Sequence, residues 1–186
     1  MTCLLNHIRT SLTERTVSLS AIRQRKWLLL FLFPLLSSCT DNDDQRAFER
    51  QAFQMPDSYT ETDGSGEVTG AEDPEDWQTA PFFRGLVEVR PAFPNPVQTT
   101  DPVEIELLVT GIESRVNGLI AYVVLDSGYI SDPLDTIDEN PVQPGIRHLR
   151  FPAQYLARFN DPRGLRRIVI FDRNDNIISY GDIEVI

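Results

Sequence analysis

The strictest constraint on the fold is a period-two alternation of apolar side chains in the C-terminal half of the chain. Between Val103 and Val109 every second residue is apolar, and Glu104 and Glu106 stand between the first three of them. Leu86 to Arg90 alternates in the same way. Because successive side chains of a strand point to opposite faces, both stretches predict half-buried strands. The residues expected to face the core are Val87, Val89, Val103, Ile105, Leu107 and Val109.

Further apolar stretches extend this pattern to the C-terminus. Leu119 to Leu125 is apolar on both faces, so we expect it to form a central strand. Three more strands are expected at residues 146–151, 166–172 and 177–186, separated by turn signals such as Asn117-Gly118 and Pro144-Gly145. One short helix is expected from Pro152 to Phe159. Several short strands with little helix predict an all-β, antiparallel β-sandwich over residues 81–186.

The N-terminal part of the chain has the composition of a secretory signal peptide. Arg23, Arg25 and Lys26 form a basic flank, and the ten uncharged residues from Trp27 to Leu36 follow it. Ten residues of helix span about half of the roughly 30 Å hydrocarbon core, which disfavours a stable membrane crossing. A secreted protein with an incidental cysteine at position 39 is the plain alternative to the interpretation that follows.

Leu36-Ser37-Ser38-Cys39 resembles the lipobox of bacterial lipoproteins. That resemblance implies removal of residues 1–38 and attachment of acyl chains, such as palmitate, to Cys39. Two or three acyl chains, at about 0.8 kcal/mol per buried CH₂, give stable membrane anchoring. We therefore expect an outer-membrane lipoprotein on the periplasmic or cell-surface face.

Processing at this site would make an acidic chain more acidic. The full chain has 17 basic and 28 acidic residues, and the first 38 residues contain five of the basic residues but only one acidic residue, Glu14. Residues 39–186 thus have 12 basic and 27 acidic side chains, a formal charge of −15. Nucleic acids and anionic headgroups are bound by clustered positive charge, so neither is expected as a partner.

Few residues are available for catalysis. After residue 39 the chain has no cysteine and one histidine, His148, and no Gly-x-Ser-x-Gly motif is present. This composition disfavours a cysteine nucleophile, a histidine-rich zinc site and a serine triad. A paired-carboxylate site stays open from sequence alone. We expect a non-catalytic protein without a cofactor.

Residues 39–80 are expected to form a flexible acidic tether. The stretch from Thr40 to Ala80 has twelve acidic residues and two arginines, a composition that usually buries too little apolar surface to order a chain. Gln45 to Phe53 has the pattern of a short helix, but isolated helices of that length are marginal in water. The aspartates at 41, 43 and 44 resemble the export signal of some Bacteroidota surface lipoproteins, although they also suit a solvated tether.

Phe93-Pro94-Asn95-Pro96-Val97 carries a second resemblance. It is similar to the proline-bracketed opening of immunoglobulin-like modules in Bacteroidota surface and secreted proteins, and the likeness covers Phe93 to Ile186. It implies an immunoglobulin-like sandwich. Some such modules are C-terminal sorting domains of the type IX secretion system, but the terminal residues 181–186 lack the basic end common there.

Two groups of residues are candidate sites. Trp77, Phe82 and Phe83 form an aromatic cluster that could be an exposed platform or a packed arm. Asp172, Asn174 and Asn176 occupy the first, third and fifth positions of a calcium loop, but Ile177 and Ile183 stand where an EF-hand requires glycine and glutamate. The plain alternative is a strand-joining turn. A weak cation site is also open at the acidic residues Asp132, Asp135, Asp138 and Glu139.

Two functional classes follow. The first is a lipid-anchored envelope protein whose sandwich docks onto another envelope protein. The alternative is a glycan-binding module that uses exposed aromatic residues and a calcium-stiffened loop. The aromatic candidates for it are Trp77, Tyr122, Tyr129 and Tyr155. Exposure separates the two classes, because a sugar platform needs aromatic side chains on an open surface.

Overall fold

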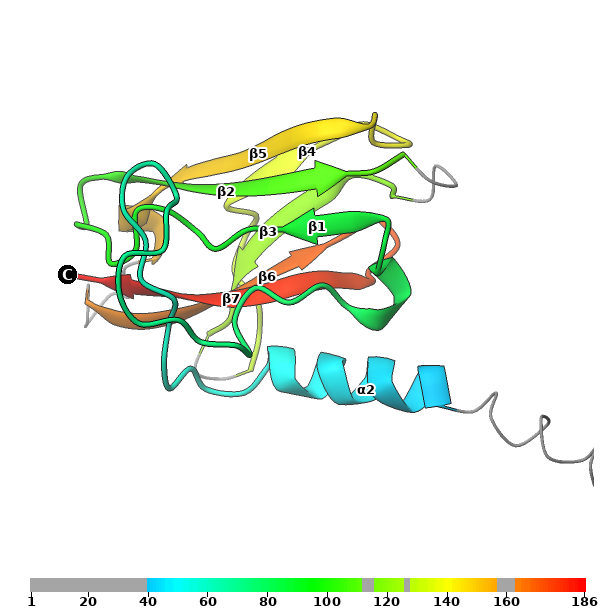
Figure 1. Ribbon diagram of the computed structural model, residues 1–186, viewed down its shortest axis with the longest axis horizontal. Coiled ribbons are helices and arrows are strands. Elements are labelled where there is room, and N and C mark those ends of the chain that lie inside the picture. The colour runs from blue at the N-terminus through cyan, green and yellow to red at the C-terminus, as the bar shows by residue number, and fades with distance from the viewer. Residues whose placement is uncertain (1–39, 112–115, 126–127, 157–162) are drawn as a thin grey trace, which may run out of the picture. The chain divides into compact units, whose positions relative to one another are not determined.

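Two antiparallel sheets form the body of the protein (Figure 1). The computed structural model describes residues 40–111, 116–125, 128–156 and 163–186. One sheet has the order β1-β2-β5, with β1 at Val87–Val89, β2 at Pro102–Val109 and β5 at Gly145–Pro152. The other has the order β4-β3-β6-β7, with β4 at Asp135–Ile137, β3 at Leu119–Val123, β6 at Gly164–Phe171 and β7 at Ile177–Val185. The predicted all-β sandwich is confirmed at this level.

The period-two pattern places the core as predicted. Val103, Ile105 and Leu107 on β2 are fully buried. In the register between β2 and β5, Val103 lies opposite Phe151 and Ile105 opposite Leu149, and these partners are buried as well. The alternation of β2 is therefore the direct consequence of one face packing on the core.

The remaining strands match the sequence with two differences. β3 lies between β4 and β6, which confirms the prediction of a central strand. No alternation marks β4, because Asp135-Thr136-Ile137 is short and has one apolar residue. The expected helix at residues 152–159 is a 3₁₀ turn, η3, at Ala153–Leu156, and residues 157–159 lie outside the described part.

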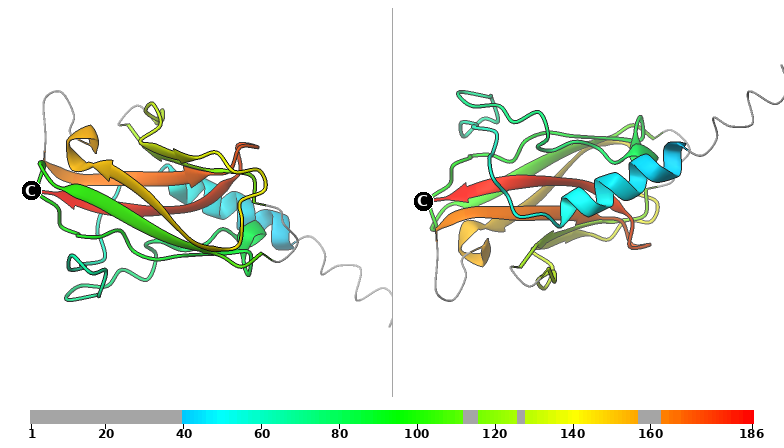
Figure 2. Two further views of the ribbon diagram at one scale, coloured as in Figure 1. Left: turned by 90° about the horizontal axis from the view of Figure 1, so that it is seen from above. Right: turned by 90° about the horizontal axis from the view of Figure 1, so that it is seen from below.

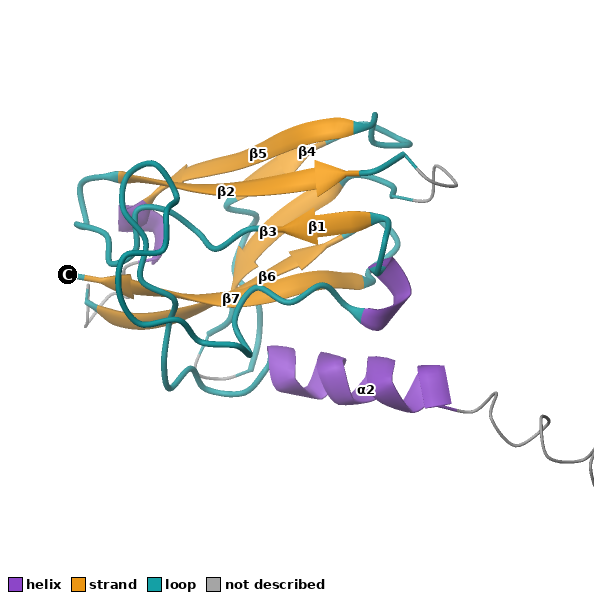
Figure 3. Ribbon diagram, in the orientation of Figure 1, coloured by secondary structure: helices purple, strands orange, loops and turns teal. Residues whose placement is uncertain are grey.

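Residues 40–80 are the main correction to the sequence analysis. Helix α2 spans Thr40–Ala52, and its Phe48 and Ala52 are buried in the core cluster. It lies along β6 and β7 (Figure 2), and the chain after it crosses the domain as loops up to η2 at Pro81–Phe83 (Figure 3). Asp41 to Ile186 form one compact unit, so the expected tether is instead part of the folded domain.

The loops bond to the free edge of β7. The amide N–H of Trp77 donates to the Tyr180 carbonyl at 3.0 Å, and that of Ala80 donates to the Ile178 carbonyl at 2.8 Å. These bonds occupy backbone groups that an edge strand would otherwise expose. Composition failed to predict this because it averages over the stretch, whereas a few well-placed apolar side chains and backbone bonds decide its order.

Asn95, in the centre of the proline-bracketed motif, joins the loops to β7. Its side-chain amide donates to the Thr60 carbonyl at 3.0 Å and to the Asp182 carbonyl at 2.9 Å. Its side-chain oxygen accepts the N–H of Glu184 at 2.9 Å, and its backbone exchanges two hydrogen bonds with Thr62. Asn95 is fully buried, and its bonds give the motif a structural role.

Trp77 is packed against a glycine of β7. A Cβ atom at Gly181 would overlap the Trp77 indole ring, so only glycine leaves room for the ring there. We expect Gly181→Ala to lower the free energy of unfolding by about 2–3 kcal/mol, the upper range for overpacking in a core. Chemical denaturation measures this loss. Gly64→Ala is the matched control, because nothing lies within 4 Å of a Cβ there. A loss in Gly181→Ala no larger than in the control would contradict the packing.

Candidate functional site

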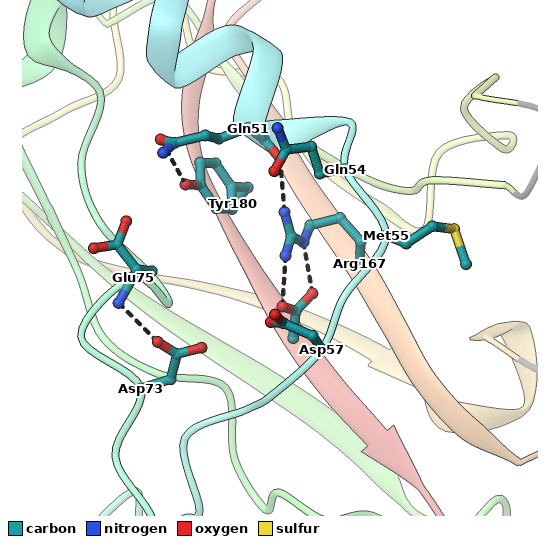
Figure 4. Close-up of a pocket in the computed structure, with 9 residues that line it drawn as sticks. Gln51, Gln54, Met55, Asp57, Asp73, Glu75, Arg167 and Tyr180 are labelled. Carbon is teal, nitrogen blue, oxygen red and sulfur yellow. Dashed lines mark hydrogen bonds and ion pairs between the residues drawn. The ribbon is translucent and has the colours of Figure 1, made fainter.

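A polar pocket lies where the C-terminal end of α2 meets β6 and β7 (Figure 4). It has a volume of about 170 Å³. Its lining comes from the end of α2, the two loops that follow and the two strands: Gln51, Gln54, Met55, Asp57, Asp73, Glu75, Arg167, Tyr180 and Asp182.

Arg167 is the centre of this pocket. It forms a bidentate ion pair with Asp182, with Nε–Oδ1 at 2.6 Å and Nη2–Oδ2 at 2.7 Å. Its Nη1 donates to the Gln51 carbonyl in the last turn of α2 at 2.8 Å, and its guanidinium lies 4.7 Å from the Tyr180 ring centroid. The Tyr180 ring also contacts Phe48 of the helix. The cluster therefore fastens α2 to the sheet.

The mouth of the pocket is acidic. Asp57, Asp73 and Glu75 lie around it, and the pKa of Asp182 is raised, mainly by burial, although its ion pair with Arg167 opposes this. The Arg167 donors described above are directed to protein acceptors, so the geometry indicates a structural cluster and assigns no reaction to the pocket.

Asp76 lies beside this cluster. Its two carboxyl oxygens accept the backbone N–H of Thr60 at 3.0 Å and of Asp182 at 2.7 Å. Burial nevertheless raises the pKa of Asp76 from 3.8 to about 7, and the negative charge of Asp182 adds to the rise.

We expect Asp76 to titrate near neutral pH in the folded protein. Because its pKa is higher in the folded than in the unfolded state, its contribution to stability is fully present below pH 3.8 and is lost as the pH rises through 7. One proton gives a slope of at most about 1.4 kcal/mol per pH unit. Carboxyl ¹³C shifts measure the titration, with Asp76→Asn to assign the signal. A midpoint below about pH 5 would show that the two N–H donors outweigh burial.

A second groove, of about 300 Å³, joins two features that the sequence singled out separately. It lies between η2 and the turn from β6 to β7 and is lined by Phe82, Phe83, Leu86, Asp172, Asn174 and Asn176. Half of the Phe82 surface is exposed, whereas Phe83 is buried. Trp77 is only 3% exposed, so it forms no exposed platform, and the alternative of a packed arm holds for it.

Asp172 organises the turn and is itself buried. Its carboxylate accepts the backbone N–H groups of Asn174 at 2.8 Å and Asn176 at 2.9 Å, together with both side-chain amides. The turn is thus stiffened by its own hydrogen bonds. Among the described residues, no three His, Cys, Asp or Glu side chains are grouped to hold a metal ion.

Three of the four other acidic candidates, which lie on β4 and in the loop from β4 to β5, are engaged one by one. Asp135 accepts the N–H of Arg150 at 2.7 Å, Asp138 pairs with Arg173, and Glu139 pairs with Arg147 at 3.3 Å. Among the tyrosines, Tyr122 packs edge-on against Phe171, whereas Tyr129 and Tyr155 are exposed. Cys39 lies outside the described residues.

The outer face of the β1-β2-β5 sheet is the third candidate surface. Leu108 and Ile146 lie opposite each other in the register and are 40% and 53% exposed. With Glu88, Arg90 and Glu106 they line a shallow depression of about 90 Å³. An apolar centre with a charged border is the arrangement of many protein interfaces.

Ion pairs continue the same face along β2 and β5 from this apolar pair. Arg90 pairs with Glu106 at 3.2 Å. Glu104 binds both His148, with Nδ1–Oε1 at 2.6 Å, and the Nε of Arg150 at 2.8 Å. His148 is therefore an exposed strand residue in a charge cluster.

No described helix combines the length and apolar composition that a membrane crossing requires.

Comparisons with known proteins give no relative. No family model, no curated protein and no solved structure matches this chain.

Proposed function

We propose that this chain is a lipid-anchored protein of the bacterial outer membrane whose β-sandwich docks, without catalysis, onto another envelope protein. The basic flank, the apolar segment from Trp27 to Leu36 and Cys39 support the anchor. Resemblance to immunoglobulin-like surface modules supports an envelope location. The periplasmic and the cell-surface face both fit this proposal.

One observation favours docking in particular: Leu108 and Ile146 stand exposed side by side on the outer face of the β1-β2-β5 sheet, near the end of β2 and the start of β5. The ion pairs beside them suit a polar rim, and interface energy is usually concentrated in such a centre. Arg90, Arg150 and the glutamates beside them would then set orientation more than affinity.

The anchor is tested by Cys39→Ala. We expect this variant to lose acyl labelling and to move from the membrane to the soluble envelope fraction, because the lipid is the proposed source of membrane affinity. Unchanged partitioning of the variant would contradict lipidation.

Docking is tested by a photocrosslinking amino acid at Ile146 in intact cells. We expect an adduct that Leu108→Arg abolishes, since a charge at the apolar centre opposes burial. Tyr155, also exposed but in η3, is the matched control position. The same adducts from Tyr155, or adducts insensitive to Leu108→Arg, would contradict docking through this face.

A further inference from the structure

We propose that the groove lined by Phe82, Leu86, Asn174 and Asn176 binds a neutral carbohydrate. This site is separate from the docking face proposed above and does not depend on it. It combines an exposed aromatic ring with amide side chains, the two elements that recognise the apolar and the hydroxyl-bearing parts of a sugar.

The aromatic side of the groove is held in place. Phe83 is buried and anchors η2, while the Phe82 N–H donates to the Gln45 side chain of α2 at 3.1 Å. Leu86, half-buried, packs against the core cluster beside it. Phe82 therefore presents its ring from a fixed backbone, and the negative face of an aromatic ring attracts the polarised C–H groups of a sugar.

The polar side of the groove offers hydrogen-bond acceptors. The Nδ2 groups of Asn174 and Asn176 donate to Asp172 at 3.3 Å and 3.1 Å. Their Oδ1 atoms are consequently directed away from that carboxylate, and no hydrogen bond within the described part of the chain uses them. An amide oxygen fixed in this way is a good acceptor for a hydroxyl group.

The charges in and around the groove favour a neutral ligand over a cation or an anion. Asp172 is only 2% exposed and its carboxylate is already surrounded by N–H donors, so a cation gains little from it. Among the residues that the structure describes, no basic side chain lines the groove, and the chain carries a net charge of −11, which disfavours an anion. A volume of about 300 Å³ lies at the small end for ligand sites, which suits one or two sugar rings.

The test is an NMR titration of the full chain in a zwitterionic detergent with EDTA present. The probes are chitotriose, cellotriose and maltotriose at millimolar concentration. We expect at least one of them to shift the side-chain amide signals of Asn174 and Asn176 and the ring signals of Phe82. Phe82→Ala and Asn174→Ala should each weaken this binding by about tenfold. Tyr129→Ala, which removes an exposed aromatic ring elsewhere, is the matched control and should leave it unchanged.

Three results would overturn the proposal. The first is the absence of shifts at these signals with all three sugars. The second is binding that survives both groove substitutions or is lost equally in the control. The third is a shift of the same signals by an extended peptide when no sugar produces one, which would assign the groove to protein docking.

Discussion

A chain that begins at Pro81 is expected to be unfolded at room temperature. It retains the seven strands of the described residues, yet it lacks α2 and the loops that cover β7. Removing a buried aromatic side chain costs about 3–5 kcal/mol, and both Phe48 and Trp77 would be lost. A domain of this size is stable by about 5–15 kcal/mol in total, so the loss is comparable with the whole free energy of unfolding.

The matched control is a chain that begins at Thr40. It keeps every contact described above, and we expect it to give a cooperative thermal transition and dispersed amide signals. Circular dichroism and NMR compare the two chains. A cooperatively folded chain from Pro81 would restore the interpretation of residues 40–80 as a tether.

Arg167→Met is expected to destabilise the protein by about 3–5 kcal/mol, because it leaves the buried Asp182 carboxylate without its partner. The double variant R167M/D182L leaves no unpaired charge and should recover much of this loss. Arg150→Met removes an exposed ion pair and should cost less than about 1 kcal/mol, which makes it the matched control.

Urea denaturation measures the three variants. The account of the Arg167 cluster would be wrong if Arg167→Met were no worse than Arg150→Met. It would also be wrong if the double variant were as unstable as the single one, since the penalty would then not come from the unpaired carboxylate.

The fold was predictable where periodicity and burial agree. β2 is read directly from Val103 to Val109, because one of its faces is buried and the other is open. On β7 the outer face is covered by α2 and its loops, so Tyr180 and Asp182 are buried together with the isoleucines. Alternation is absent there, and only tertiary structure explains the pattern.

The candidate sites were predictable only in part. Arg167 within an apolar strand is a signal that a buried partner exists, but its pairing with Asp182 requires the register of β6 and β7. The groove joins Phe82 to a turn that begins at Asp172, residues that are far apart in the sequence. Trp77 was ambiguous because composition does not state whether an aromatic residue is exposed.

Packing of residues 40–80 has a consequence for the proposed anchor. Cys39 immediately precedes Thr40, the first residue of α2. The compact unit begins at Asp41, so the folded body would start two residues after the proposed lipid site instead of at the end of a long flexible chain.

Hydrogen exchange of the full chain tests most directly whether residues 40–80 are packed against the β-sandwich. The amide protons of Trp77 and Ala80 bond to β7, and that of Asn95 bonds to Thr62. We predict that all three exchange as slowly as the amides of β7 itself, because they open only when the domain unfolds. Exchange of the Trp77 and Ala80 amides at the rate of an unstructured chain, with β7 still protected, would contradict the account.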